Sequence, residues 1–201
     1  MRVRTEDRRQ AILEAAIEVF RKVGYERASM AMISERLGGS KTTLYGYYPS
    51  KEKLFAAAMV EALREQSDKA IAILDPAEQD VTVVLRRFGE AYHRIISSHD
   101  ALSLTRAAVA EATNQNLGPT LYAMGTKRVD DVLTTYMTLL KAKGAIRSVE
   151  PRIAASHMHA LYDAGTLIPL LFGAKPEFKS KDAIRAAVDA FWAAYGVEQP
   201  S

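Results

Sequence analysis

Apolar residues recur along this chain at the three- and four-residue spacing of amphipathic helices, and short polar or glycine-containing breaks separate the runs. In the first run, which starts after Thr5, the residues Ile12, Val19 and Phe20 lie at helical spacing, and Gly24 follows them. A glycine directly after the last periodic residue is typical of a helix C-terminus. The pattern therefore predicts a first helix that ends at Gly24.

Three serines precede the next three runs. Ser29, Ser40 and Ser50 each occupy an N-cap position, where a serine hydroxyl accepts a hydrogen bond from a free amide of the first turn. A glycine pair ends the first of these runs, and a proline ends the second. These signals predict helices over residues 30–37, 41–47 and 51–74.

Asp75 and Pro76 mark the first break between modules, and helical patterns continue beyond them. The later patterns cover roughly residues 80–98, 101–115, 119–143, 151–172 and 181–196. The alternation of apolar and polar residues that marks a half-buried strand does not persist anywhere. We therefore expect an all-α protein of about nine helices.

Composition narrows the class of protein. The absence of cysteine excludes disulfides, thiolate metal sites and a cysteine nucleophile. The N-terminus is charged, and the longest uncharged apolar stretch, Ala164 to Ala174, has only 11 residues. A membrane-spanning helix needs about 20 residues. We therefore expect a cytoplasmic protein without a membrane segment.

The net charge of +3 is unevenly distributed. Residues 1–60 hold 11 Lys and Arg against 7 Asp and Glu, a net charge of +4, whereas residues 61–201 hold 16 against 17, a net charge of −1. A basic N-terminal segment favours contact with phosphates. An ordinary solvated surface is the alternative, and the charge count alone does not separate the two.

The stretch from residue 38 to residue 55 reads GGSKTTLYGYYPSKEKLF. In this stretch a glycine turn and a second short helix follow the short helix predicted over residues 30–37. This order is typical of a helix-turn-helix, in which the second helix enters the major groove of DNA. On that second helix Leu44 and Tyr48 point inward, and the outward positions are Lys41, Thr42, Thr43 and Tyr47. Thr and Lys side chains can contact base edges, and tyrosine hydroxyls and the Lys51 amine suit phosphate oxygens. For any one of these residues, an ordinary helix start or a packed tyrosine is the alternative.

Residues 10–60 resemble the DNA-binding domain of the TetR (TetR/AcrR) family of bacterial transcriptional regulators. The resemblance rests on ILEAAIEVFRKVGYERASMAMIS and on GGSKTTLYGYYPSKEKLF. The remainder, with LTRAAVAEA and KGAIRSVEPRIAA, resembles the helical regulatory domain of the same family. The resemblance implies an N-terminal three-helix helix-turn-helix domain over residues 1–50, a connecting helix over 51–75, and a C-terminal effector-binding and dimerisation domain over 76–201.

The resemblance also implies a set of DNA contacts, namely Ser29, Ser40, Lys41, Thr42, Thr43, Tyr45, Tyr47 and Lys51. Two positions depart from the family pattern. Gly39 stands where an apolar residue is common, and Gly46 stands where many members carry an aromatic residue. The leading arginines form either a DNA-binding arm or a solvated terminus, and they are Arg2, Arg4, Arg8 and Arg9.

A cavity for a small effector in the C-terminal domain is a further implication of the resemblance. The candidate lining residues are Phe88, Tyr92, Leu104, Tyr122, Met124, Met137, Tyr162 and Phe172. A lining of this kind suits a largely apolar or aromatic effector, although core packing explains each residue equally well. We expect no cofactor and no metal.

Wide apolar stripes on the last two predicted helices favour a homodimer. The candidate interface residues are Met158, Leu161, Gly165, Ile168, Ile184, Val188 and Phe191. Burial within one subunit is the alternative for part of this set. A two-fold dimer presents its recognition helices about 34 Å apart, or somewhat more, and favours a palindromic operator.

The sequence thus indicates a ligand-responsive regulator of transcription, a repressor that leaves double-stranded operator DNA when a small molecule binds. A non-specific DNA-packaging protein is one alternative, but most of the chain has no basic excess. A small helical enzyme that uses His157 and His159 is the other. Residues two apart on a helix point in nearly opposite directions, and no known catalytic motif is present. We therefore expect no enzymatic activity.

Overall fold

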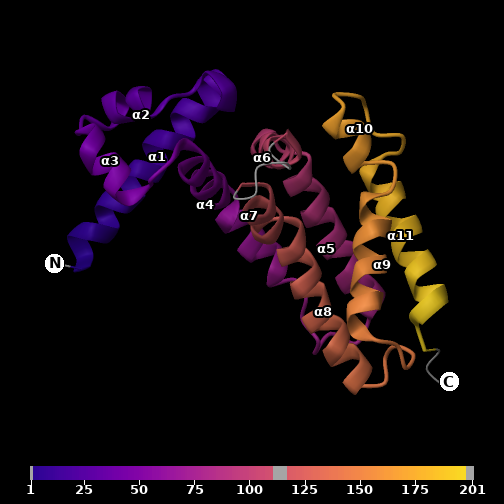
Figure 1. Cartoon of the computed structure of the whole chain (residues 1–201). Coiled ribbons are helices and arrows are strands. Elements are labelled where there is room, and N and C mark those ends of the chain that lie inside the picture. Colours follow the sequence, from indigo (N-terminus) through magenta and orange to yellow (C-terminus); the bar gives the residue numbers. More distant parts are fainter. Residues whose placement is uncertain (1, 111–116, 198–201) are drawn as a thin grey trace. The chain divides into compact units, whose positions relative to one another are not determined.

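The computed structural model of the protein describes residues 2–110 and 117–197, and the side chains of residues 5–110 and 118–197. Within these ranges the regular elements are helices, which confirms the all-α prediction (Figure 1). The helices are α1 (Arg2–Arg27), α2 (Met30–Leu37), α3 (Lys41–Tyr47), α4 (Lys51–Ile71), α5 (Val81–Ile96), α6 (His99–Ala110), α7 (Leu117–Met124), α8 (Thr126–Ala142), α9 (Pro151–Asp163), α10 (Leu167–Leu171) and α11 (Ser180–Tyr195).

The chain forms two compact units. Unit 1 comprises residues 1–65 and 99–124, and unit 2 comprises residues 66–98 and 125–201. The units do not follow chain order, because α6 and α7 pack against each other and α6 also contacts α1. The division by function at residues 50 and 75 stays a prediction.

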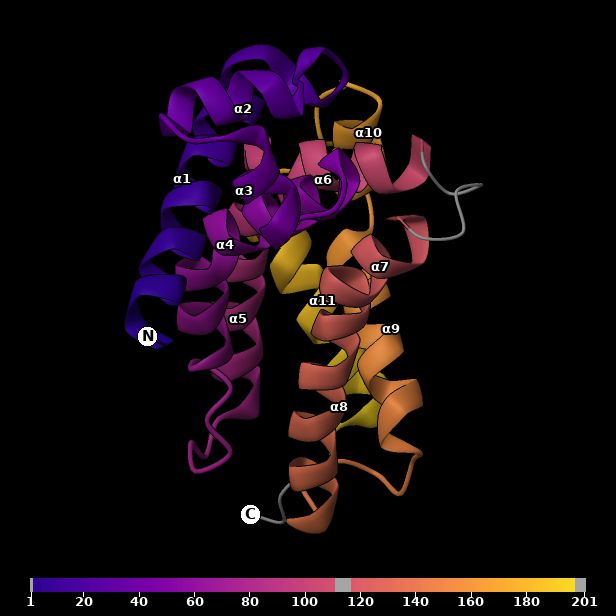
Figure 2. The ribbon, with the colours of Figure 1, turned by 60° about the vertical axis from the view of Figure 1, so that its left-hand side comes forward.

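The caps of unit 1 form where the sequence places them. Gly24, with φ 78° and ψ 166°, interrupts α1. The hydroxyl of Ser29 accepts a hydrogen bond from the Met32 amide at 3.2 Å, which starts α2. Gly38, with φ 65°, ends α2 in the left-handed region, where a side chain is strained. These caps explain why α2 begins and ends at the predicted residues. Figure 2 shows α2 and α3 as short helices beside the longer α1.

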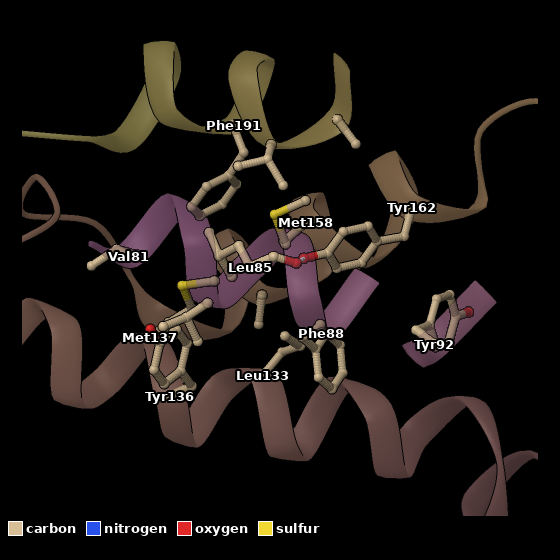
Figure 3. Close-up of a cluster of buried hydrophobic side chains, with 14 of the residues drawn as sticks. Val81, Leu85, Phe88, Tyr92, Leu133, Tyr136, Met137, Met158, Tyr162 and Phe191 are labelled. Atoms are coloured by element: carbon tan, nitrogen blue, oxygen red, sulfur yellow. Dashed lines mark hydrogen bonds between the residues drawn. The ribbon is translucent and has the colours of Figure 1, made fainter. Parts of the chain in front are cut away.

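Four helices of unit 2 surround one apolar core. Helix α8 packs along α9, α9 along α11, and α11 along α5. Figure 3 shows Leu85, Met137, Met158 and Phe191, one from each helix, converging in this core, and each is at most 1% exposed. The apolar faces that the sequence predicts for these helices are therefore buried against one another inside unit 2.

Two predicted long helices are wrong, because each is broken in the structure. The run over residues 119–143 divides at Gly125, whose ψ of −97° is not helical. The run over residues 151–172 divides at Gly165, whose φ is 67°. A Cβ atom at Gly165 would lie 2.8 Å from the Phe178 ring, so both the backbone and the close contact require glycine. The apolar spacing continues through both breaks and conceals them.

Membrane insertion is a separate question. None of the helices in the described residues is both long enough and apolar enough to cross a bilayer.

Candidate nucleic-acid interface and effector site

The predicted recognition helix α3 is a seven-residue helix with a buried anchor. The Ser40 hydroxyl accepts a hydrogen bond from the Thr43 amide at 3.1 Å and also bonds the Thr43 hydroxyl at 2.9 Å. Leu44 is fully buried and Tyr48 is 7% exposed, as predicted. Helix α3 is thus fixed by one cap and two inward side chains, and its opposite face is left for contacts.

Three of the predicted DNA-contacting side chains on α3 are exposed, and two are half-buried. Lys41, Thr42 and Tyr45 belong to the exposed group, whereas Thr43 and Tyr47 are half-buried. The Thr43 hydroxyl is already engaged with the cap, so Thr42 is the better-placed threonine for reading a base edge.

Lys51, the predicted phosphate contact on α4, bonds within unit 1. Its Nζ atom donates to the Tyr25 carbonyl at 3.1 Å and lies 4.3 Å from the centre of the Tyr25 ring. That ring in turn packs on Phe55 at 4.7 Å. Lys51 therefore ties the start of α4 to the end of α1, a structural role that the sequence did not indicate.

The N-terminal arginines are only partly within the described side chains. The backbone of Arg2 and Arg4 belongs to α1, but their side chains lie outside the described part. The Arg9 guanidinium pairs with Glu6 at 3.2 Å. A Cβ atom at Gly39 would lie 2.5 Å from Arg8 Nη2. Arg8 thus occupies the space that an apolar residue at position 39 would need.

The eight predicted effector contacts are divided between the two units. Four are buried together in unit 2: Phe88, Tyr92, Met137 and Tyr162. In unit 1 Leu104 is buried on α6, and on α7 Met124 is half-buried while Tyr122 is 53% exposed. Phe172 follows α10 and is 85% exposed. A groove in unit 2 beside Trp192 and Lys143 is lined by none of the eight.

A partly buried polar cluster crosses this part of unit 2. The Tyr92 hydroxyl on α5 contacts Asp163 Oδ1 at 2.7 Å and His159 Nε2 at 2.8 Å, both on α9. The other imidazole nitrogen, His159 Nδ1, contacts Asp130 Oδ1 on α8 at 2.6 Å. We call these four residues the His159 cluster. It joins three helices through side chains that the apolar core would otherwise exclude.

Burial controls the acidity of two groups in this cluster. Burial raises the pKa of the Asp163 carboxyl, although the hydrogen bond from Tyr92 opposes the rise. Burial also raises the pKa of the Tyr92 hydroxyl, and the neighbouring Asp163 carboxylate adds to the effect. Asp163 therefore holds a proton more tightly than an ordinary surface carboxyl.

Sequence reasoning identified Tyr92 and His159 but missed Asp130 and Asp163. His159 and Asp163 are four residues apart, so they lie on one face of α9. That spacing was a usable signal. Nothing local connects Asp130 to them, because it comes from another helix.

The predicted interface residues fall into two groups. Met158, Ile184, Val188 and Phe191 are at most 2% exposed and belong to the core of unit 2, so burial within one subunit accounts for them. Of the remaining residues, Leu161 and Gly165 are half-buried, and Ile168 is 61% exposed. The exposed positions of α9 and α11 are different ones, and they include Ile153, Ser156, Ala160, Ala186, Ala190 and Ala193.

The two histidines considered for catalysis point to different neighbours. His157 is exposed and its Nδ1 contacts the Tyr195 hydroxyl, whereas His159 is buried in the polar cluster. The near-opposite directions expected for residues two apart are observed.

Comparison with known proteins gives the same picture for both parts of the chain. Residues 12–58 match the family model described as bacterial regulatory proteins, tetR family. Residues 83–197 match the model described as AefR-like transcriptional repressor, C-terminal domain.

Individual relatives extend over most of the chain. The HTH-type nicotine-responsive transcriptional repressor HdnoR of Paenarthrobacter nicotinovorans is 25% identical over 196 residues, which is 95% of this chain and 97% of the relative. The HTH-type transcriptional regulator YhgD of Bacillus subtilis is 26% identical over 169 residues, or 79% and 82% of the two chains. A solved TetR-family regulator from Mesorhizobium loti has a TM-score of 0.85 at 24% identity, covering 96% and 99% of the two chains. The chain is therefore a DNA-binding transcriptional regulator that belongs to the TetR family.

Proposed function

We propose that this protein is a transcriptional repressor that binds a palindromic operator as a homodimer and is released by a small, largely apolar or aromatic effector. The observation that carries the proposal is the anchored helix α3, which holds Leu44 in the core and leaves Lys41, Thr42 and Tyr45 exposed. A relative named as a nicotine-responsive repressor supports a small organic effector.

The proposed DNA contacts are of two kinds: some read the bases, and others bind the phosphates and position the protein on the DNA. Lys41, Thr42, Thr43 and Tyr47 are the base-reading candidates of α3. Tyr45, Lys51 and the cap hydroxyls of Ser29 and Ser40 contact the phosphates, where a serine hydroxyl can donate its proton while it accepts from the helix amide. The larger contribution to sequence preference comes from Thr42, because its hydroxyl is not used in the cap.

The homodimer uses the exposed faces of α9 and α11 in this proposal. Ile153 is 50% exposed, and Ala160, Ala186 and Ala190 are also exposed. Small side chains let two helix pairs approach closely around a two-fold axis. The core residues Met158 and Phe191 support this surface from behind.

Release follows from linkage between the two binding sites. The effector must bind the conformation that is incompetent for DNA more tightly, and operator DNA must then weaken effector binding by the same factor. We place the protein in the cytoplasm, where the operator is, and assign it no enzymatic activity.

The test is binding to DNA fragments from the upstream region of the protein's own gene and to scrambled fragments, at one fixed salt concentration. We expect the upstream DNA to bind at least 10³-fold more tightly than scrambled DNA, as is common for specific regulators. Replacing Thr42 and Thr43 with Ala should reduce this ratio. The matched control is Thr135→Ala, because Thr135 is an exposed threonine on α8.

Equal affinity for upstream and scrambled DNA would reject the proposal of specific repression in favour of non-specific DNA packaging. If the variant with both Thr42→Ala and Thr43→Ala keeps the parent's ratio of affinities for upstream and scrambled DNA, the proposal that these threonines of α3 read bases is rejected.

A further inference from the structure

The hydrogen-bonding contacts of the His159 cluster can be satisfied by more than one set of proton positions. Tyr92 has a single hydroxyl proton but contacts both Asp163 at 2.7 Å and His159 at 2.8 Å. His159 Nδ1 contacts the Asp130 carboxylate, so this nitrogen carries a proton. The remaining protons have two arrangements that satisfy every contact.

In the first arrangement Asp163 is ionised. Tyr92 donates to Asp163, and His159 donates from both nitrogens, which makes it an imidazolium. In the second arrangement Asp163 is protonated and donates to the Tyr92 oxygen, Tyr92 donates to His159 Nε2, and His159 is neutral. Both arrangements contain three protons, and with Asp130 ionised both carry a net charge of −1.

No side-chain cation of the described residues offsets this charge by an ion pair. The ion pairs of Asp130 and Asp163 are both with His159. The nearest basic residues in sequence to Asp130 are bound elsewhere, since Lys127 pairs with Asp131 and Arg128 pairs with Asp68. His93, the neighbour of Tyr92 on α5, bonds Ser180 and the Tyr162 carbonyl. A partly buried negative charge without a counter-ion is unfavourable.

The two carboxylates are also the open side of the cluster. The side chains of Asp130 and Asp163 are 28% and 26% exposed, whereas that of His159 is 7% exposed. The Tyr92 ring stands edge-on to the His159 ring at 5.4 Å and stacks with Phe88 at 6.4 Å. Solvent therefore reaches the acidic ends of the cluster.

We propose that the His159 cluster binds the positively charged nitrogen of a small organic amine through the Asp163 carboxylate. This inference rests on the proposed function, because it names the chemical class of the effector. The amine supplies the counter-ion that the cluster lacks, and Asp163 is the acceptor because its position at the end of α9 leaves it partly open.

Binding shifts protons inside the cluster without releasing one. Starting from the second arrangement, in which Asp163 is protonated and His159 is neutral, pairing of the amine with Asp163 moves the carboxyl proton to the Tyr92 oxygen and the Tyr92 hydroxyl proton to His159 Nε2. His159 becomes an imidazolium between Tyr92 and Asp130. The number of protons is unchanged, so the heat of binding should be the same in buffers of different ionisation enthalpy.

The experiment uses two probes of equal shape on the full-length protein at pH 7. Benzylamine is charged, and benzyl alcohol is its neutral counterpart. By isothermal titration calorimetry we expect benzylamine to bind at least tenfold more tightly than benzyl alcohol. Asp163→Asn should abolish this difference, because the amide can donate to Tyr92 and preserve the cluster but carries no charge. Asp131→Asn, which alters an exposed carboxylate next to Asp130, should leave it intact.

A second readout follows His159 itself. In protein labelled with ¹⁵N at histidine, benzylamine should shift the His159 ring resonances to the imidazolium position and leave the exposed His99 unchanged. Equal affinity for the two probes, an Asp163→Asn variant that still prefers benzylamine, or unshifted His159 resonances would each overturn the site. Release of one proton per bound amine would overturn the proton shift.

The outcome is separable from that of the proposed function. A protein that binds upstream DNA specifically but shows no preference for benzylamine overturns the amine site alone. A protein that prefers benzylamine but binds all DNA equally overturns the repressor proposal alone.

Discussion

Two glycines at the recognition helix differ in what a side chain would meet. Gly38 has a φ of 65°, so any other residue is strained there. Gly46 lies on α3 with an ordinary backbone, and a Cβ atom at this position would meet nothing within 4 Å. The residue that departs from the family pattern at position 46 is therefore not required by the fold.

Gly46→Ala should raise the free energy of unfolding by about 0.5–1 kcal/mol, because alanine loses less backbone entropy in a helix. Gly38→Ala should lower it by about 1 kcal/mol or more. Urea denaturation of both variants measures the free energy of unfolding and checks the direction of each change. A Gly46→Ala variant that is less stable than the parent would contradict the open space at this position.

An ion pair links α1 to α6 within unit 1. Arg21 Nε donates to both carboxylate oxygens of Asp100, at 3.0 and 3.2 Å, and Asp100 is buried. The hydrogen bonds from Arg21 lower the pKa of Asp100, although burial opposes them. This contact adds a polar component to the packing between α1 and α6.

Stability should depend on pH through this pair. A lowered pKa in the folded state means that the pair stabilises the fold above the unfolded pKa of about 3.9 and that this contribution is lost as the pH falls through the lower folded pKa. Asp100→Asn should therefore be less stable than the parent at pH 7, and the difference should shrink from about pH 4 downward. The control is Asp182→Asn, whose exposed pair with Arg185 should contribute little. A difference that stays constant with pH would show that Asp100 acts by packing alone.

At the scale of the element, the N-terminus of α4 has a structural role and a proposed DNA-binding role, and one variant can separate them. The Lys51 amine is bonded to the Tyr25 carbonyl and lies over the Tyr25 ring. Lys51→Ala should lower the free energy of unfolding by about 1 kcal/mol through these contacts. If Lys51 also meets a phosphate, the same variant should bind all DNA more weakly and reduce the salt slope by about 1.

Salt titrations of DNA binding, with Lys141→Ala as the matched exposed lysine on α8, check this prediction. A Lys51→Ala variant that loses stability but keeps the parent salt slope would leave Lys51 with the structural role only.

For the whole molecule, dimerisation should control DNA affinity, because two linked half-site contacts bind far more tightly than one. Ala190→Glu places a charge on the exposed face of α11. It should give monomers in sedimentation equilibrium and weaken operator binding by about 10²-fold or more. Thr135→Glu, on the exposed face of α8, is the control. An Ala190→Glu variant that sediments with the parent would place the interface elsewhere.

Local signals were enough to identify the regulator and its DNA-binding end. Ser29 and Ser40 cap helices α2 and α3 as expected, and Leu44 is buried as expected. Caps, turns and anchors of this kind depend on residues within a few positions of one another, so the sequence alone determines them.

The tertiary structure alone decided which apolar stripes are covered and which polar groups meet. Val188 and Phe191 lie at the helical spacing that is also expected of residues in a dimer interface. Only the packing of the helices showed that they are buried inside unit 2. The contact between Asp130 and His159 joins α8 to α9 through two residues that are 29 positions apart in the sequence. Periodicity records that a side chain points inward, but it carries no information on which distant residue it will meet there.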